Sequence, residues 1–172
     1  MLRTWLEDSL HDARTRAEAE GLSGRQAEEF ITRHRFDLAL ARAGQELLDG
    51  SVSGQPENSV RHLLEHTLTH HAREAAAHGL AMVMYEGGTH VVVEPASHDD
   101  AEMVAFFTAL NYSPEMGTAY RALIEGWRAL TPAPFNAYKD IQMPNIWGSW
   151  GALRHLDDDN PRWQALMEAT AR

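Results

Sequence analysis

The stretch that most constrains the fold is residues 80–93, LAMVMYEGGTHVVV. It opens with an apolar run that is too short to cross a bilayer and that suits a strand buried on both faces. Gly79 precedes the run, and Gly87 and Gly88 follow Glu86 at its C-terminal end. Because ligands of α/β proteins bind at the C-terminal ends of parallel strands, Glu86 is the first candidate for chemistry.

Helical patterns flank this predicted strand on both sides. Apolar spacing, capping residues and helix propensity mark the predicted helices, which cover residues 4–20, 23–49, 58–77, 101–110, 115–130 and 162–171. A second apolar stretch, residues 135–141, is predicted to be another strand. The two helices between the strands form a long crossover, which implies a parallel pair. The sequence therefore predicts a helix-rich α/β fold.

Composition narrows the classes of function. A chain of 172 residues suits one domain, and its net charge of −10 argues against nucleic acid or an anionic membrane as a partner. The sequence has no cysteine, which excludes disulfides, thiolate nucleophiles and Cys-ligated zinc. The start, MLRTWLEDSL, lacks the apolar core of a signal peptide, so the chain as given is expected in the cytoplasm. No cofactor motif is present.

Three stretches carry a resemblance to a known family: MYEGGTH, ALNYSPEMGTAYRALIEGW and PFNAYKDIQMPNIWGSWGALRHLDDDNPRW. Over residues 36–165 the sequence resembles a group of bacterial glycoside-hydrolase-like (β/α)8 (TIM) barrels. The resemblance implies that residues 80–86 correspond to strand seven and residues 135–141 to strand eight. It also implies a carbohydrate ligand, with Glu86 at the position of the nucleophile.

The chain departs from that family in its number of strands. A complete barrel has eight strands and about 200 residues or more, whereas only two strands are predicted here. Residues 1–56 are expected to be N-terminal helices and residues 57–172 a barrel-like segment, forming one domain or a barrel fragment. A retaining glycosidase needs a second carboxyl about 5 Å from the nucleophile, and the strand that bears it in the family is missing. We therefore expect little activity from the chain alone, and self-association or an upstream segment covering the strand edges.

Further candidates for the sugar site lie beyond the two predicted strands: His90, Asn136, Tyr138, Asp140, Trp147 and Trp150. Aromatic faces at the mouth of a pocket suit sugar rings, and polar side chains at strand ends suit their hydroxyls. Each candidate also has a structural interpretation, with Glu86 bonded to the glycine turn and the tryptophans packed beneath a loop. The alternative function is accordingly a non-catalytic sugar-binding or vestigial domain.

A histidine motif offers a third function. Residues 62–66, HLLEH, match the H-x-x-E-H pattern of inverted zinc metallopeptidases, and His70 extends the same ridge by one turn. No third ligand is recognisable, so we expect a solvated ridge without metal and rank a zinc hydrolase below the sugar-directed functions. The acids at 157–159 suit calcium or, without a metal, the start of a helix.

Overall fold

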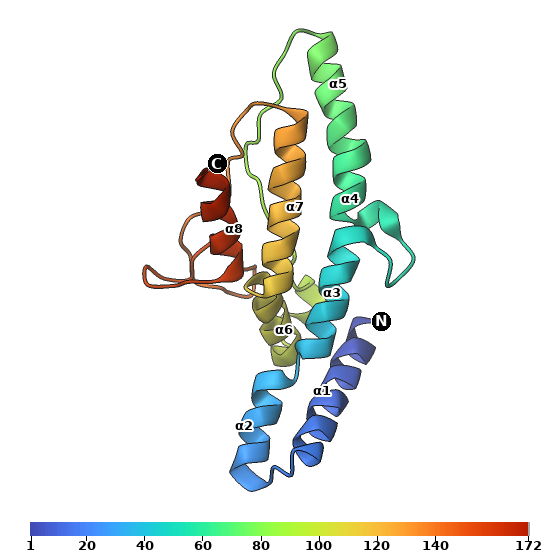
Figure 1. Cartoon of the computed structure of the whole chain (residues 1–172), viewed down its shortest axis with the longest axis vertical. Helices are drawn as coiled ribbons and strands as arrows, with labels where there is room; N and C mark the ends of the chain where they lie inside the picture. The colour runs from blue at the N-terminus through green and yellow to red at the C-terminus, as the bar shows by residue number, and fades with distance from the viewer. Residues whose placement is uncertain (172) are drawn as a thin grey trace. The chain divides into compact units, whose positions relative to one another are not determined.

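The computed structural model describes residues 1–171 and is built of helices, which make up 61% of the chain (Figure 1). Within the described residues there is no sheet, and the strand-like pairing amounts to three isolated bridges. The predicted α/β fold, with strands seven and eight of a barrel, is therefore wrong, and the fold is all-helical. The chain divides into two compact units, Met1–Gly44 (unit 1) and the residues from Gln45 onward (unit 2).

Unit 1 contains α1 (Leu2–Ala19), α2 (Gly24–His34) and the first half of α3 (Asp37–Asp49). A single helix was predicted over residues 23–49, but the chain breaks between α2 and α3. The hydroxyl of Ser9 in α1 accepts hydrogen bonds from the backbone N–H groups of Leu38 and Ala39, at 3.1 and 3.2 Å. Ser9 thereby caps the start of α3 from another helix, which a local sequence pattern does not reveal.

Unit 2 begins with five helical segments, of which the last three follow one another without a break. These are the end of α3, η1 (Pro56–Asn58), α4 (Val60–His62), the π-helical η2 (Leu63–Leu68) and α5 (Thr69–Ala77). Residues 78–94, which contain no helix and which we call the extended segment, are followed by η3 (Pro95–Ser97). The chain then forms α6 (Ala101–Asn111), α7 (Pro114–Leu130) and, after a long loop, α8 (Pro161–Thr170). Side chains at the N-caps of α6, α7 and α8 accept backbone N–H groups, and these caps are Asp100, Ser113 and Asn160.

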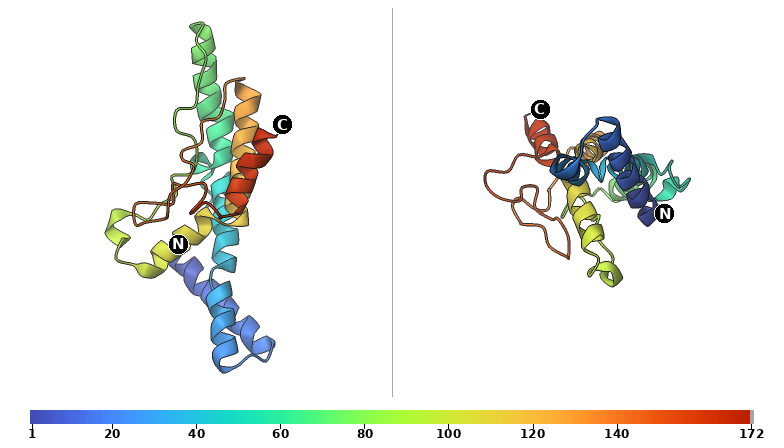
Figure 2. Two further views of the ribbon diagram at one scale, coloured as in Figure 1. Left: turned by 90° about the vertical axis from the view of Figure 1, so that its left-hand side faces the viewer. Right: turned by 90° about the horizontal axis from the view of Figure 1, so that it is seen from below.

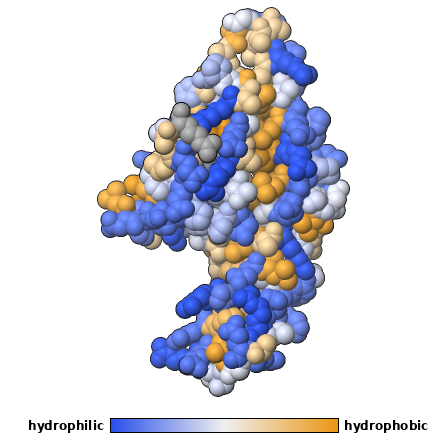
Figure 3. All heavy atoms as spheres, viewed as in Figure 1, coloured by the Kyte–Doolittle hydropathy of each residue, from blue (hydrophilic) through white to orange (hydrophobic). Residues whose placement is uncertain are grey.

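Helix α7 is the centre of unit 2, since it packs against α8, η2, α4 and α6. Two glycines let neighbours approach it closely. A Cβ atom at Gly117 would lie 2.8 Å from the carbonyl oxygen of Pro161, and one at Gly126 would lie 2.4 Å from Cδ2 of Leu64. Between α7 and the α4–α5 run, hydrophobic residues reach the surface (Figure 3).

The predicted strand of residues 80–86 forms no sheet: residues 80–84 have no regular secondary structure, and residues 85–86 form a bend. Its expected burial on both faces is also wrong, because Leu80, Val83 and Tyr85 are 67%, 68% and 80% exposed. The segment runs beside the loop after α7 (Figure 2), and one parallel bridge joins Gly87 to Ala137. The expected parallel direction is thus found at that single point. Two extended segments without further neighbours do not make a stable sheet.

The helices of residues 1–171 include none that is both long enough and apolar enough to cross a membrane.

Candidate functional site

Four of the predicted sugar-site residues line one hollow in unit 2, with a volume of about 400 Å³. Glu86 and His90 come from the extended segment, and Tyr138 and Trp150 come from the loop between α7 and α8. The rest of the lining is the Gly87–Gly88–Thr89 turn. We call this space the Glu86 hollow.

Backbone hydrogen bonds hold the walls of the Glu86 hollow together. The N–H of Gly87 donates to the carbonyl of Asn136 at 2.8 Å, and the N–H of Tyr138 donates to the carbonyl of Gly87 at 2.8 Å. The N–H of Lys139, which follows a cis peptide bond, donates to the carbonyl of Trp150 at 3.1 Å. These bonds hold three stretches that are distant in sequence, at Gly87, residues 136–139 and Trp150, around one space.

Gly88 allows the turn after Glu86 to lie close against α7. Its φ of +142° is unfavourable for other residues, and a Cβ atom there would lie 2.7 Å from the hydroxyl oxygen of Tyr120. The next backbone N–H, that of Thr89, donates to the same hydroxyl at 3.0 Å. This hydrogen bond joins the turn to α7, whereas the side chains of Glu86 and His90 are exposed to solvent.

Aromatic rings form one wall of the Glu86 hollow. The ring centroids of His90 and Trp150 are 5.0 Å apart, and the ring of Tyr138 stands edge-on to Trp150 at 6.3 Å. Tyr138 is 43% exposed, and Trp150 is half-buried. Glu86 and His90 are exposed, so the hollow presents aromatic surface beside a hydrogen-bond acceptor and an imidazole.

The other three predicted sugar-site residues lie outside this hollow. The side-chain amide of Asn136 donates to the carbonyl of Tyr85 and so joins the two loops. Asp140 accepts the N–H of Ile141 at 2.7 Å and lines a different hollow beside α8. Trp147 is 65% exposed, and its ring meets that of His98 edge-on with centroids 5.0 Å apart.

Glu86 is the single carboxylate among the residues that line the hollow. A retaining glycosidase places its two carboxyl groups about 5 Å apart, and an inverting enzyme places them about 6.5–9.5 Å apart. Asp140, the acid predicted at the same end as Glu86, opens onto another space. The lining therefore offers groups that bind a ligand and lacks an acid–base pair.

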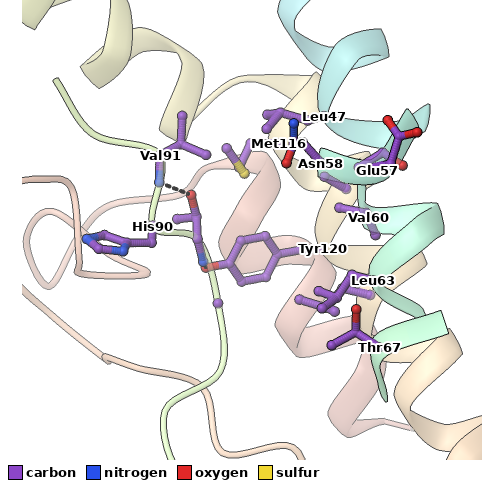
Figure 4. A pocket seen from close by; sticks show the side chains of 15 residues that line it. Leu47, Glu57, Asn58, Val60, Leu63, Thr67, His90, Val91, Met116 and Tyr120 are labelled. Atoms are coloured by element: carbon purple, nitrogen blue, oxygen red, sulfur yellow. Dashed lines mark hydrogen bonds between the residues drawn. The ribbon is translucent and has the colours of Figure 1, made fainter. Parts of the chain in front are cut away.

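A second hollow adjoins the same turn on the side of the helices (Figure 4). Its volume is about 350 Å³, and it shares Gly88, Thr89 and His90 with the Glu86 hollow. Its remaining walls come from α3, η1, α4, η2 and α7 and are mainly aliphatic, with Leu63 and Met116 among them. Glu57, Asn58 and Thr67 are polar members of the lining, but apolar surface predominates, so this space suits an apolar ligand better than a sugar.

Sequence reasoning missed the buried cation that supports the loop. Arg162, at the start of α8, is fully buried, and its guanidinium donates to the carbonyl of Ser149 at 2.8 Å. The guanidinium carbon also lies 4.6 Å from the ring centroid of Tyr112 and 5.8 Å from that of Tyr120. Burial raises the pKa of Tyr120, so its hydroxyl stays neutral and continues to accept the N–H of Thr89. Nothing in the local sequence distinguishes Arg162 from an exposed arginine.

The acids at 157–159 belong to the same supporting loop. The guanidinium of Arg154 donates to both carboxylate oxygens of Asp158, and the backbone N–H of Arg154 donates to one of them at 2.8 Å. The side-chain amide of Asn160 donates to Asp158 at 3.1 Å. Asp158 therefore orders the loop ahead of α8 through protein partners.

The HLLEH motif lies on α4 and η2. The rings of His62 and His66 are 4.5 Å apart by their centroids, and Glu65 is exposed. In the part of the chain that the structure describes, no three His, Cys, Asp or Glu side chains are grouped so as to hold a metal ion. The motif therefore supplies a pair of imidazoles on a helix surface.

Comparison of the chain with protein-family models, with curated proteins and with solved structures gives no match, which leaves the residues of the Glu86 hollow as the guide to function.

Proposed function

We propose that this chain binds carbohydrate, without hydrolysing it, in the Glu86 hollow. One observation carries the proposal: an exposed carboxylate and an exposed imidazole border the same space as the rings of Tyr138 and Trp150. A sugar presents hydroxyls at its edge and C–H bonds on its faces, so it needs both kinds of partner.

Each wall of the hollow has a role in this proposal. The carboxylate of Glu86 accepts hydrogen bonds from sugar hydroxyls, and the imidazole of His90 donates or accepts one. The partly exposed ring of Tyr138 packs on the sugar's C–H face, with Trp150 beside it. A volume of about 400 Å³ falls in the usual range for small-molecule sites.

Two further points support carbohydrate as the ligand and binding as the role. The stretches YEGGTH and WGSWGALRHLDDDNPRW, which contain most of the lining, resemble glycoside-hydrolase-like proteins. The lining includes one carboxylate where hydrolysis requires two. Because the hollow is open and its polar groups are exposed, we expect a dissociation constant of about 0.1–1 mM.

The test is a titration with a panel of oligosaccharides, followed by tryptophan fluorescence and by NMR. We expect at least one sugar to saturate the protein, and Tyr138→Ala to weaken its binding about tenfold or more. Trp147→Ala is the matched control, because this exposed aromatic residue lies outside the hollow and its loss is expected to leave affinity unchanged. Glu86→Gln removes the charged acceptor and is expected to weaken binding several-fold.

Two outcomes of the titration contradict the proposal. The first is that no sugar in the panel saturates the protein. The second is that Trp147→Ala weakens binding as much as Tyr138→Ala does. Aryl glycosides test the absence of hydrolysis, and we expect no release of the aryl group. Release that disappears in Glu86→Gln would show that the chain is catalytic.

A further inference from the structure

The second hollow, on the helical side of the turn at residues 88–90, is a separate space from the proposed sugar site (Figure 4). Its volume of about 350 Å³ falls in the usual range for small-molecule sites. Four of its aliphatic side chains are half-buried and so keep part of their apolar surface in solvent; these are Leu47, Val60, Leu63 and Leu123. An apolar ligand that covers this surface removes it from water, which is favourable.

The π-helical turn η2 forms one wall of the second hollow. Leu63 and Thr67 line the space, whereas the neighbouring Leu64 packs against Gly126 of α7. The carbonyl of Leu64 accepts a hydrogen bond from the hydroxyl of Thr69 at 2.8 Å. Because π-helical turns are rare and occur frequently at functional sites, this irregular wall is a second indication that the hollow binds a ligand.

Glu57 in η1 carries the only formal charge among the described residues that line the second hollow. It is exposed, and within residues 1–171 its carboxylate makes no ion pair or hydrogen bond. The arginine nearest to it in sequence, Arg61, pairs instead with Asp49 at 3.5 Å. The ring of His90 points away from the helices, toward Trp150 (Figure 4). The opening of the hollow is therefore negative and favours a cationic group over an anionic one.

We propose that the second hollow binds a small apolar amine, with the apolar part of the ligand against the aliphatic walls and its ammonium group beside Glu57. A primary amine has an ordinary pKa of about 10.4, so it is protonated at pH 7. An apolar cavity of about 150 Å³ holds benzene, and in that proportion the hollow has room for roughly 10–14 non-hydrogen atoms. The proposal goes beyond the sugar site and does not rest on it.

The two parts of such a ligand contribute unequally to its affinity. Glu57 is exposed, and an exposed ion pair contributes little because water and salt screen it. Most of the affinity therefore comes from the apolar part, which covers the half-buried leucine and valine side chains. The charge of Glu57 instead selects the head group: it favours an amine over an alcohol and disfavours a carboxylate.

The first test compares three probes with the same octyl chain: octylamine, octanol and octanoate. Each is titrated into the full chain below its aggregation concentration and followed by NMR. We expect octylamine to saturate the protein, octanol to bind several-fold more weakly, and octanoate to bind about tenfold more weakly than octylamine. In Glu57→Gln, the preference for octylamine over octanoate is expected to fall to about twofold or less. Glu74→Gln is the matched control, because this exposed acid lies outside the hollow and its loss leaves the preference unchanged.

The second test locates the probe, because a chain with a net charge of −10 attracts amines over its whole surface. Ala119 is buried on α7 and lines the hollow, so Ala119→Leu fills part of the space. This variant is expected to bind octylamine and octanol at least tenfold more weakly. Ala122→Leu, on the same helix but outside the hollow, is the matched control and is expected to bind both probes as the wild type does. Circular dichroism checks that both variants are folded.

Three outcomes overturn the proposal. Octylamine fails to saturate the protein, octanoate binds as tightly as octylamine, or a folded Ala119→Leu variant binds octylamine as the wild type does. If Ala119→Leu does not fold, Glu57→Gln decides, and an unchanged preference for the amine in that variant overturns the site. A sugar that saturates the Glu86 hollow is expected to leave octylamine bound, so failure at one site is distinguishable from failure at the other.

Discussion

At the scale of single residues, Asp158 is the strongest electrostatic anchor of the loop before α8. Its side chain is 2% exposed, and the Arg154 guanidinium holds it through both oxygens. These hydrogen bonds favour the ionised form, so they hold the pKa of Asp158 well below the ordinary carboxyl value. A lowered folded-state pKa gives stability that is present above the unfolded pKa of about 3.9 and is lost as the pH falls below it.

This anchor gives the first pH-dependent prediction. Asp158→Asn is expected to lower the free energy of unfolding at pH 7 by about 2 kcal/mol, because it removes charged hydrogen bonds from a buried site. The difference in the free energy of unfolding between the variant and the wild type is expected to shrink below about pH 4, because protonation of Asp158 then begins to destabilise the wild type. Urea denaturation of the variant and the wild type at pH 7 and pH 3 measures this difference at each pH. Asp157→Asn, at an exposed neighbour, is the control, and a difference that stays constant with pH contradicts the prediction.

The candidate site was partly predictable at this scale. Glu86, His90, Tyr138 and Trp150 were selected for their chemistry and their places after two apolar runs, and all four line one hollow. The supporting Arg162 was not predictable, because its burial depends on rings and carbonyls that folding brings from elsewhere in the chain. The chemistry of a side chain follows from the residue itself, whereas its burial depends on which other parts of the chain fold around it.

At the scale of elements, α7 organises unit 2 through its two glycines. Gly117 faces the backbone of Pro161, which starts α8, and Gly126 faces the flexible side chain of Leu64 in η2. An isolated helix gains about 1 kcal/mol when alanine replaces glycine. Here that gain competes with the overlap that a new methyl group creates. The overlap is more severe at Gly117, because a backbone cannot rotate away as a leucine side chain can.

We therefore expect Gly117→Ala to lower the free energy of unfolding by about 1–3 kcal/mol, in spite of the better helix propensity of alanine. Gly126→Ala is expected to cost less, because the atoms that a new methyl group meets there belong to the end of the flexible Leu64 side chain. Chemical denaturation of the two variants beside Thr118→Ala, an exposed neighbour, gives the comparison. A Gly117→Ala variant that is more stable than the wild type contradicts the close approach of α7 and α8.

The helices were predictable and the strands were not, for one physical reason. The predicted helices over residues 58–77, 101–110 and 115–130 match the structure closely, because a helix satisfies its own backbone. A strand needs neighbours, and residues 80–86 find a single bridge beyond their end. The break between α2 and α3 was missed for the same reason, since its cap, Ser9, comes from another helix.

At the scale of the whole molecule, the exposed apolar residues 80–85 and the Glu86 hollow belong to unit 2 and to one stretch of chain. The extended segment supplies residues 80–85 and continues directly into Glu86 and His90 of the hollow. Residues 80–85 present apolar side chains, whereas the hollow presents a carboxylate and aromatic rings.

The exposure of residues 80–85 also bears on where a protease cuts the protein first. Proteases bind their substrates as extended strands, and within residues 1–171 the N–H groups of residues 81–86 have no hydrogen-bond partner to hold them back. Chymotrypsin is therefore expected to cut first after Tyr85, which is 80% exposed. Mass spectrometry of the first fragments checks the site. A first cut elsewhere would mean that the segment is better protected than its exposure indicates.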